Sequence, residues 1–489
     1  MAELINSNRN KKILSFEGYL YHKHSSNSNR TRTYWVCNKK PECSVRAVTI
    51  NEPLQMIKVG KHDHPPNQDE VVAKRIYAEL KEEAAVHPEA KPSLLIREKL
   101  GEVDSLVLPL LPERETMKRT LNKKRIANFP TNPTDITALR GIPPQFRSTK
   151  NRDNFIIFDS FDAEDEEDSS DKEEIYQNPN RIIVFGTTRN LSLLSRSMII
   201  FLDGTFKTCP QIFTIHGTVH GTVFPLVYAL LPNKTTESYR AVLRAVADKC
   251  VELGFAAPRP RSIMSDFELA IINSVKQVYP QSTILLCFFH LSQSVWRHLQ
   301  SIGLQVAYND SENREVKNGF SQLLALAFVP AEDVSRVFNM LKPTLPQSME
   351  ELAKYFDRTY VNGSRELVRR RYRVQPPRYS PVLWNHYQSV LHDGPRTNNS
   401  TEGWHNRFQS LVGKNHPSIY YLLRQFLKEQ VDTEKQIIEI QAGRKVRKPR
   451  EAKYERLIIR LRTIVSRYEE HKTERTELDY LRAIGHNIA

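Results

Sequence analysis

Residues 198–231 read MIIFLDGTFKTCPQIFTIHGTVHGTVFPLVYALL. The apolar runs at 198–202, 213–220 and 223–231 are short, rich in β-branched and aromatic residues, and separated by Gly, Thr and Pro. Such runs, bounded by turn-forming residues, are typical of strands. This stretch therefore predicts three consecutive strands joined by turns.

Beyond these strands the pattern alternates between helix and strand. Residues 236–254 carry apolar side chains at helical spacing, and residues 262–264 form a short apolar run before Asp266. The pattern then predicts a helix at 267–279, a strand at 283–289 and a helix at 291–299. The order β-β-β-α-β-α-β-α predicts a mixed α/β sheet of the ribonuclease-H-like type, in which two strands end side by side.

Two carboxylates follow strand ends in this plan. Asp203 and Asp266 each come after a buried apolar strand, where open α/β sheets place their ligands. Two carboxylates that meet there form a negative pocket suited to divalent cations. Each also has a simpler explanation, because Asp203-Gly204 is a common hairpin turn and Asp266 is a favourable N-cap for the helix that follows.

A third carboxylate is expected on a helix that packs across the sheet. Residues 396–408 read RTNNSTEGWHNRF, and Glu402 is the candidate. A glutamate in the first turn of a helix is also stabilised by the helix dipole alone, and for Glu402 taken singly this is the stronger explanation. Only the combination with Asp203 and Asp266 favours a catalytic role.

A Cys-x-x-His element lies between the second and third carboxylates. Cys287 ends an apolar strand and His290 follows one turn later. The pair could support the site, but a cysteine at a strand end is usually a core residue, and a nearby histidine is usually hydrogen-bonded. A second zinc site would need two further ligands, which the sequence does not identify.

The amino-terminal segment carries the spacing of a zinc site. Cys37-x5-Cys43 and His62-x-His64 offer two thiolates and two imidazoles, which suit a tetrahedral zinc ion. A closed four-ligand site stabilises a segment too short to fold on its own core. Around the ligands lie ordered aromatic residues and basic residues suited to phosphate contacts: Phe16, Tyr19, Tyr21, Tyr34, Trp35, Lys39, Lys40, Arg46, Lys58 and Lys61.

Composition supports a polyanionic partner. Lys plus Arg number 71 against 56 Asp plus Glu, a formal charge of +15. The first twenty residues lack a secretory apolar core, and no run of about eighteen uncharged apolar residues occurs, so neither secretion nor a membrane partner is expected. The odd cysteine count of 5 fits a reducing compartment.

The length of 489 residues predicts several folded units. Residues 302–373 read as helical and charged, and the basic segment within them, with Arg369, Arg370 and Arg371, could contact a phosphate backbone or form a solvated face. The domain plan is a zinc finger at 8–66, a helical region at 72–128, a linker with an acidic loop at 129–180, an α/β domain at 181–430 with a helical insertion at about 302–390, and a charged helical tail at 431–489.

The motifs resemble two known families. The first segment, with F-x-G-Y-x-Y, Y-W-x-C and all four ligands, resembles the FLYWCH zinc finger. Roughly residues 190–425 are similar to the Mutator-like element (MULE) transposases. The motifs that carry this resemblance are D-G-T-F, S-D-F-E-L-A, C-x-x-H and N-N-x-x-E-x-x-H-N-R-F. That resemblance places the catalytic triad on Asp203, Asp266 and Glu402, and the family's Cys-x-x-His element on Cys287 and His290.

The resemblance implies a nuclear DNA-binding enzyme with structural zinc that cuts and joins DNA through two magnesium or manganese ions. It also implies a homo-oligomer on DNA, although no heptad seam long enough to confirm this is present. Protein binding is the alternative role for the finger. The alternative for the whole chain is a domesticated, catalytically silent nuclear zinc-finger regulator that keeps the fold.

Overall fold

The structure is a computed structural model, and it describes residues 2–6, 11–86, 91–127, 133–139, 141–161, 180–205, 211–368, 371–413, 417–446 and 452–488. The acidic stretch at 162–174, Arg369 and Arg370 lie outside these residues. The chain divides into two compact units, Met1–Asn132 and Pro133–Ala489. Among the described helices, none has the length and apolar character needed to cross a membrane.

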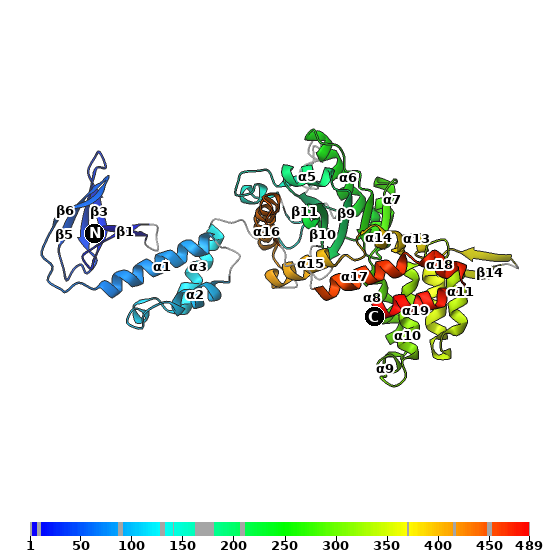
Figure 1. The fold of residues 1–489 in the computed structure, drawn as a ribbon. Coiled ribbons are helices and arrows are strands. Elements are labelled where there is room, and N and C mark those ends of the chain that lie inside the picture. The colour runs from blue at the N-terminus through cyan, green and yellow to red at the C-terminus, as the bar shows by residue number, and fades with distance from the viewer. Residues whose placement is uncertain are drawn as a thin grey trace. The chain divides into compact units, whose positions relative to one another are not determined.

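A six-stranded antiparallel sheet opens the first unit (Figure 1). Neighbouring strands pair in sequence order. The first strand begins upstream of residue 8, where the sequence suggested that the finger starts. The strands are β1 (Glu3–Asn6), β2 (Lys12–Phe16), β3 (Tyr19–Ser26), β4 (Arg32–Cys37), β5 (Arg46–Asn51) and β6 (Leu54–Val59).

Helix α1 (Gln68–Val86) belongs to two cores of the first unit. Its Val71 and Ala78 pack with apolar residues of β1, β2 and β3. Its Tyr77 and Leu80 pack instead with residues of α2 (Pro92–Gly101) and α3 (Arg114–Ala127). The sheet and the helices are therefore joined through one rigid element.

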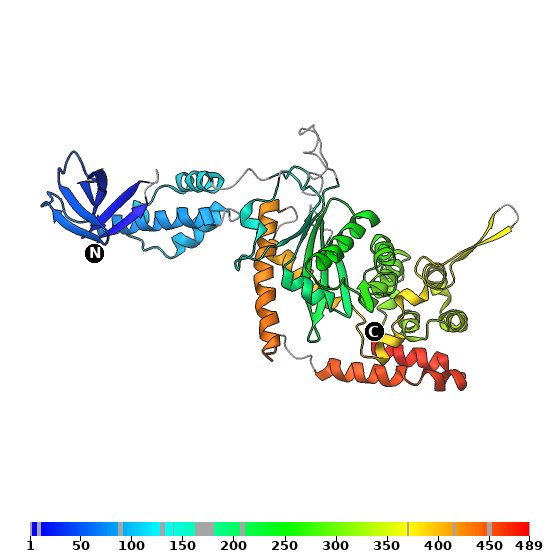
Figure 2. The same cartoon turned by 90° about the horizontal axis from the view of Figure 1, so that it is seen from above.

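The second unit is built on a seven-stranded mixed sheet (Figure 2). The strand order is β13-β12-β9-β10-β11-β8-β7, with β9, β12 and β13 parallel and β9, β10 and β11 antiparallel. The predicted order of strands and helices from residue 198 to residue 299 is confirmed. The strands are β7 (Ile156–Asp159), β8 (Ile183–Phe185), β9 (Ile199–Thr205), β10 (Gln211–Val219), β11 (Thr222–Leu231), β12 (Ser262–Ser265) and β13 (Thr283–Leu286).

Helices cover both faces of this sheet. Val227 and Ala229 of β11 share a core with Val242 of α6 (Thr236–Glu252). The intervening Tyr228 points to the other face, where it stacks on Phe426. That second face is covered by α15 (Asn399–Val412) and α16 (Ile419–Gln441), while α5 (Thr188–Ser195) and α7 (Leu269–Val278) pack with α6 or its sheet face. Successive side chains of β11 thus point to opposite faces of the sheet, and each face is covered by its own layer of helices.

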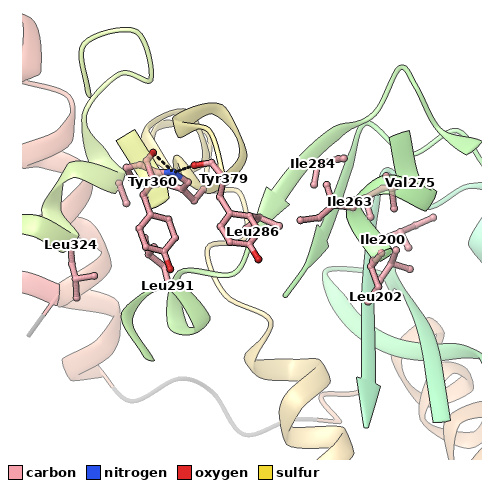
Figure 3. Close-up of a cluster of buried hydrophobic side chains, with 14 of the residues drawn as sticks. Ile200, Leu202, Ile263, Val275, Ile284, Leu286, Leu291, Leu324, Tyr360 and Tyr379 are labelled. Atoms are coloured by element: carbon pink, nitrogen blue, oxygen red, sulfur yellow. Dashed lines mark hydrogen bonds between the residues drawn. The ribbon is translucent and has the colours of Figure 1, made fainter. Parts of the chain in front are cut away.

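The insertion between β13 and α15 shares the main core with the sheet (Figure 3). Leu286 of β13 and Leu291 of α8 (Phe288–Ser301) lie in one cluster with Leu324 and Tyr360. The insertion contains α9 (Gln305–Tyr308), α10 (Glu315–Ala325), α11 (Val334–Leu341), α12 (Glu350–Phe356), α13 (Pro381–Trp384) and α14 (Tyr387–Leu391).

The expectation of helix through residue 373 is wrong at its end. Residues in β14 (Ser364–Val368) and β15 (Arg371–Gln375) pair as an antiparallel hairpin, which includes Arg371. Alternating large and charged residues around Arg369 and Arg370 suit the period of a strand as well as a solvated helix. The backbone pairing decides in favour of the hairpin.

The carboxyl-terminal helices belong to the same core as the insertion. Leu461 of α17 (Ala452–Val465) and Ile484 of α19 (Glu477–Ile488) are fully buried in it. At α18 (Tyr468–Thr473), Lys472 Nζ lies 2.7 Å from Asp333 Oδ2. Helices α17, α18 and α19 therefore pack as a layer on the insertion.

A buried ion pair joins the outer two strands of the large sheet. Arg181 donates from Nε to Asp159 Oδ1 at 3.0 Å and from Nη2 to Oδ2 at 2.6 Å, and both side chains are 1% exposed. Removing one partner leaves an unpaired buried charge, so Arg181→Leu should lower the free energy of unfolding by about 3–5 kcal/mol. Hydrogen exchange of the β7 and β8 amides measures the loss.

Two controls accompany that prediction. Arg196 is exposed, and its side chain bonds Ser192 of the helix that it caps, so Arg196→Leu should leave the exchange rates unchanged. The double variant with Asp159→Leu should be more stable than Arg181→Leu alone, because it removes the unpaired carboxylate. A double variant that is less stable than either single variant contradicts this explanation.

Candidate functional site

The four predicted ligands of the first unit converge on one point. Cys37 ends β4, Cys43 follows in the next turn, and His62 and His64 follow β6. Cys37 Sγ lies 3.3 Å from His64 Nε2, Cys43 Sγ lies 3.4 Å from His62 Nδ1, and the two histidine nitrogens are 3.3 Å apart. All four ligand atoms lie within 4.8 Å of one another.

These separations fit a zinc ion. Tetrahedral bonds of the usual Zn–N and Zn–S lengths place neighbouring ligand atoms roughly 3.3–3.8 Å apart. Burial lowers the pKa of His62, with the charge of His64 adding to the effect, so the neutral imidazole that binds metal is favoured. Burial raises the pKa of the Cys37 thiol, and zinc is the charge that offsets this cost.

Aromatic residues orient the histidine ligands. The Tyr21 hydroxyl lies 2.8 Å from His62 Nε2, and the Tyr19 ring stacks on the His62 ring with centroids 3.8 Å apart. His64 Nδ1 lies 3.0 Å from the Pro65 carbonyl oxygen. These contacts leave His62 Nδ1 and His64 Nε2 to bind metal, which fixes one tautomer for each ring.

The predicted basic residues of the finger line its outer surface. Lys40, Arg46, Lys58 and Lys61 are exposed, and Lys39 is half-buried. Val48 pairs with Tyr34 on one side and with Lys58 on the other, so these three side chains share a face with Arg46. Tyr34 is 39% exposed, so this face offers both positive charge and an aromatic ring.

The three predicted catalytic carboxylates come from three elements of the second unit. Asp203 lies in β9, Asp266 follows β12, and Glu402 lies in the first turn of α15. Because β9 and β12 are parallel neighbours, their carboxyl ends meet at one edge of the sheet. Helix α15 packs against β9 and brings Glu402 to the same edge.

The charges of these carboxylates affect one another. Burial raises the pKa of Asp203 well above its ordinary value, and the charges of Asp266 and then Glu402 raise it further. Burial raises the pKa of Asp266 and Glu402 as well, and nearby His290 partly opposes both shifts. A group of carboxylates whose negative charges are penalised in this way is one that a divalent cation would stabilise.

The helix N-cap suggested for Asp266 and the hairpin turn suggested for Asp203 are found only in part. Asp266 Oδ1 accepts the Glu268 backbone N–H at 3.1 Å, but the residue before α7 is Glu268 rather than Asp266. Asp203 Oδ1 accepts the Gly204 backbone N–H at 2.9 Å inside a continuous strand, which extends to Thr205 and is no hairpin turn.

Sequence reasoning missed a histidine that lies beside Asp203. His405 Nε2 lies 3.6 Å from Asp203 Oδ2 and 3.0 Å from Thr214 Oγ1, and Thr214 in turn bonds the Asp203 backbone carbonyl at 3.3 Å. Burial lowers the pKa of His405 to about 3, so its ring is neutral. The spacing E-x-x-H places His405 one turn after Glu402, and this signal could have found it.

A fourth carboxylate was also missed. Glu268 accepts a hydrogen bond from the Tyr239 hydroxyl at 2.9 Å, and its charge raises the pKa of Asp203. Partial burial lowers the pKa of the Lys234 ammonium group, while the charges of Glu268 and Asp266 oppose this shift. The spacing D-x-E, which places Glu268 two positions after Asp266, could have indicated this residue.

Cys287 and His290 lie at the same edge as the triad. Cys287 follows β13, the outermost parallel strand, and its Sγ lies 3.9 Å from Glu402 Oε1. His290 Nδ1 lies 3.4 Å from the same carboxylate oxygen. The described residues contain one further group of ligand atoms within 4.8 Å besides the finger, and it consists of Cys287, His290 and Glu402.

Comparison with known families assigns both regions. Residues 199–294 match the MULE transposase domain. This match contains Asp203, Asp266, Cys287 and His290, whereas Glu402 lies outside it. Residues 4–64 match the FLYWCH zinc finger domain, which contains all four zinc ligands. No curated protein matches the chain.

A FLYWCH finger followed by a MULE domain supports a transposase-like, DNA-binding protein. The FLYWCH match and the two-cysteine, two-histidine cluster together support a structural zinc ion.

Proposed function

We propose that this chain is a nuclear DNA transposase whose strand-cleavage site consists of Asp203, Asp266 and Glu402. The observation that supports the proposal is that the charges of Asp266 and Glu402 raise the pKa of Asp203, which lies in a strand that matches the MULE domain. The strand order β13-β12-β9-β10-β11, with its parallel and antiparallel pairs, supports a ribonuclease-H-like fold for this site.

The chain's own residues position the reacting groups. Asp203 lies between the other two carboxylates in the proposed arrangement. Thr214, which is bonded to neutral His405, donates to the Asp203 backbone carbonyl and so positions the strand there. Asp266 is oriented by the Glu268 backbone N–H. Two magnesium or manganese ions held by the three carboxylates would activate water or a 3′ hydroxyl and stabilise the leaving oxygen.

DNA contacts are assigned to both units. The finger face that carries Arg46, Lys58 and Tyr34 provides positive charge for phosphates and an exposed ring. Arg371 lies in the β14–β15 hairpin of the insertion, next to Arg369 and Arg370 in the sequence. Assembly as a homo-oligomer on paired DNA ends completes the proposal.

Plasmid cleavage by the purified full chain tests this function. With magnesium or manganese, the zinc-loaded protein should convert supercoiled plasmid to nicked circles, and nicking should stop when the divalent ion is withheld. A protein that binds DNA tightly but never nicks it with either ion instead supports the catalytically silent zinc-finger regulator.

A further inference from the structure

The Cys-x-x-His element gains a third potential ligand only in the folded chain. Cys287 at the end of β13 and His290 in the first turn of α8 approach Glu402 of α15, which is 115 positions from Cys287. The two distances to Glu402 Oε1, 3.9 Å from Cys287 Sγ and 3.4 Å from His290 Nδ1, are close to the edges of a tetrahedral coordination shell.

We propose that Cys287, His290 and Glu402 form a second zinc site, which competes with magnesium or manganese for the third proposed catalytic carboxylate. A thiolate and an imidazole are poor ligands for magnesium but good ligands for zinc. Three protein ligands with a fourth position open to solvent are typical of reactive zinc sites. The His290 and Glu402 side chains are 25% and 23% exposed, so the site lies near the surface.

The surroundings of the three ligands support a metal site. The Asn398 backbone N–H donates to Cys287 Sγ at 3.2 Å, a contact that stabilises a thiolate bound to metal. Within the described part of the chain, His290 Nδ1 is buried and has no hydrogen-bond partner, and the same is true of both polar atoms of the fully buried Asn398 side chain. Unpaired buried polar atoms are costly, and a bound ion would pair His290 Nδ1.

Charge balance also favours a divalent ion. One zinc ion, one thiolate, one neutral imidazole and one carboxylate sum to zero charge, and binding releases the thiol proton to solvent. Zinc at this position withdraws Glu402 from the other two carboxylates. This consequence rests on the proposed nuclease function, whereas zinc binding itself does not.

Zinc counting tests the site without any need for activity. Full-length protein is equilibrated in buffers of increasing free zinc, and the metal per chain is measured by atomic emission. Wild type should bind two zinc ions and Cys287→Ser one, because a hydroxyl replaces the soft ligand. The second ligand variant, His290→Asn, should also bind one zinc ion. The control variant Cys250→Ser removes a buried thiol that belongs to neither described ligand group, and it should bind two.

Each outcome separates the two proposals. A single zinc ion per wild-type chain at free zinc that saturates the finger overturns the second site, as do two ions retained in both ligand variants. Two ions in wild type and one in each ligand variant, together with no plasmid nicking, support the zinc site and remove only the nuclease. Where nicking occurs, added zinc should suppress it.

Discussion

Asp203→Asn should lower metal-dependent plasmid nicking by about 10³-fold or more and, in the same sample, raise the melting temperature of the second unit. The loss follows because Asp203 is the central carboxylate of the proposed site. The gain follows because burial and the negative charges of Asp266, Glu402 and Glu268 oppose its ionised form. Asparagine can still accept the Gly204 backbone N–H at Oδ1.

The stability gain depends on pH in a defined direction. Folding raises the pKa of Asp203, so the folded chain holds a proton that the unfolded chain releases near the ordinary value of 3.8. Below that value both states are protonated, and the variant has no advantage. As pH rises through the interval up to the raised pKa, wild type loses stability and the variant does not. Thermal melts across this interval, without added magnesium or manganese, measure the difference.

Asp248→Asn is the matched control. Asp248 is an exposed carboxylate on α6, so its removal should change neither nicking nor the melting temperature. If Asp203→Asn cuts plasmid as fast as wild type, the proposed triad is wrong. A lower melting temperature in Asp203→Asn than in wild type would show that the ionised Asp203 carboxylate stabilises the second unit rather than destabilising it.

Cys43→Ser should unfold the finger while the second unit stays folded. Structural zinc contributes about 10–16 kcal/mol of apparent binding free energy to a domain of this kind, and losing one of four ligands removes most of it. The sheet core around the ligands is small, with Leu14, Trp35 and Ala47 among its members, and cannot replace that contribution. Hydrogen exchange should become fast in β4, β5 and β6.

Cys250→Ser separates loss of zinc from loss of any buried thiol. Cys250 is buried in α6, where Sγ lies 3.9 Å from the Leu191 carbonyl oxygen. The Cys250→Ser variant should keep its full zinc content and slow hydrogen exchange in the finger. The Cys43→Ser variant should also lose DNA affinity. Slow exchange in β4–β6 of Cys43→Ser, with one zinc fewer, would mean that the sheet folds without its metal.

Local patterns carried most of the fold prediction. The strands β9, β10 and β11 could be predicted because turn residues interrupt long apolar runs, and the zinc ligands because their spacing is short and regular. The hairpin at 364–375 was taken for helix because charged and apolar residues there satisfy both periods. Strand pairing, which decided the matter, is not a local property.

Contacts between distant segments account for what could not be predicted. Glu402 approaches Cys287 across 115 positions, so the sequence offered two ligands of the candidate second site but no third. His405 reaches Thr214 across 191 positions. In both cases the fold of α15 across the sheet creates the neighbourhood, and no spacing rule within one segment contains it.

The packing of α19 against α10 has a consequence for how the protein is made. Gly485 of α19 lies so close to Ser321 of α10 that an added Cβ would be 3.2 Å from the serine Cβ, and Tyr480 bonds the Phe328 carbonyl oxygen. A ribosome synthesises α10 long before α19. Until α19 has emerged, the nascent chain therefore exposes the apolar residues of α10 and α11 that α19 covers, and a chain that ends before Glu477 should be a substrate for chaperones and proteases.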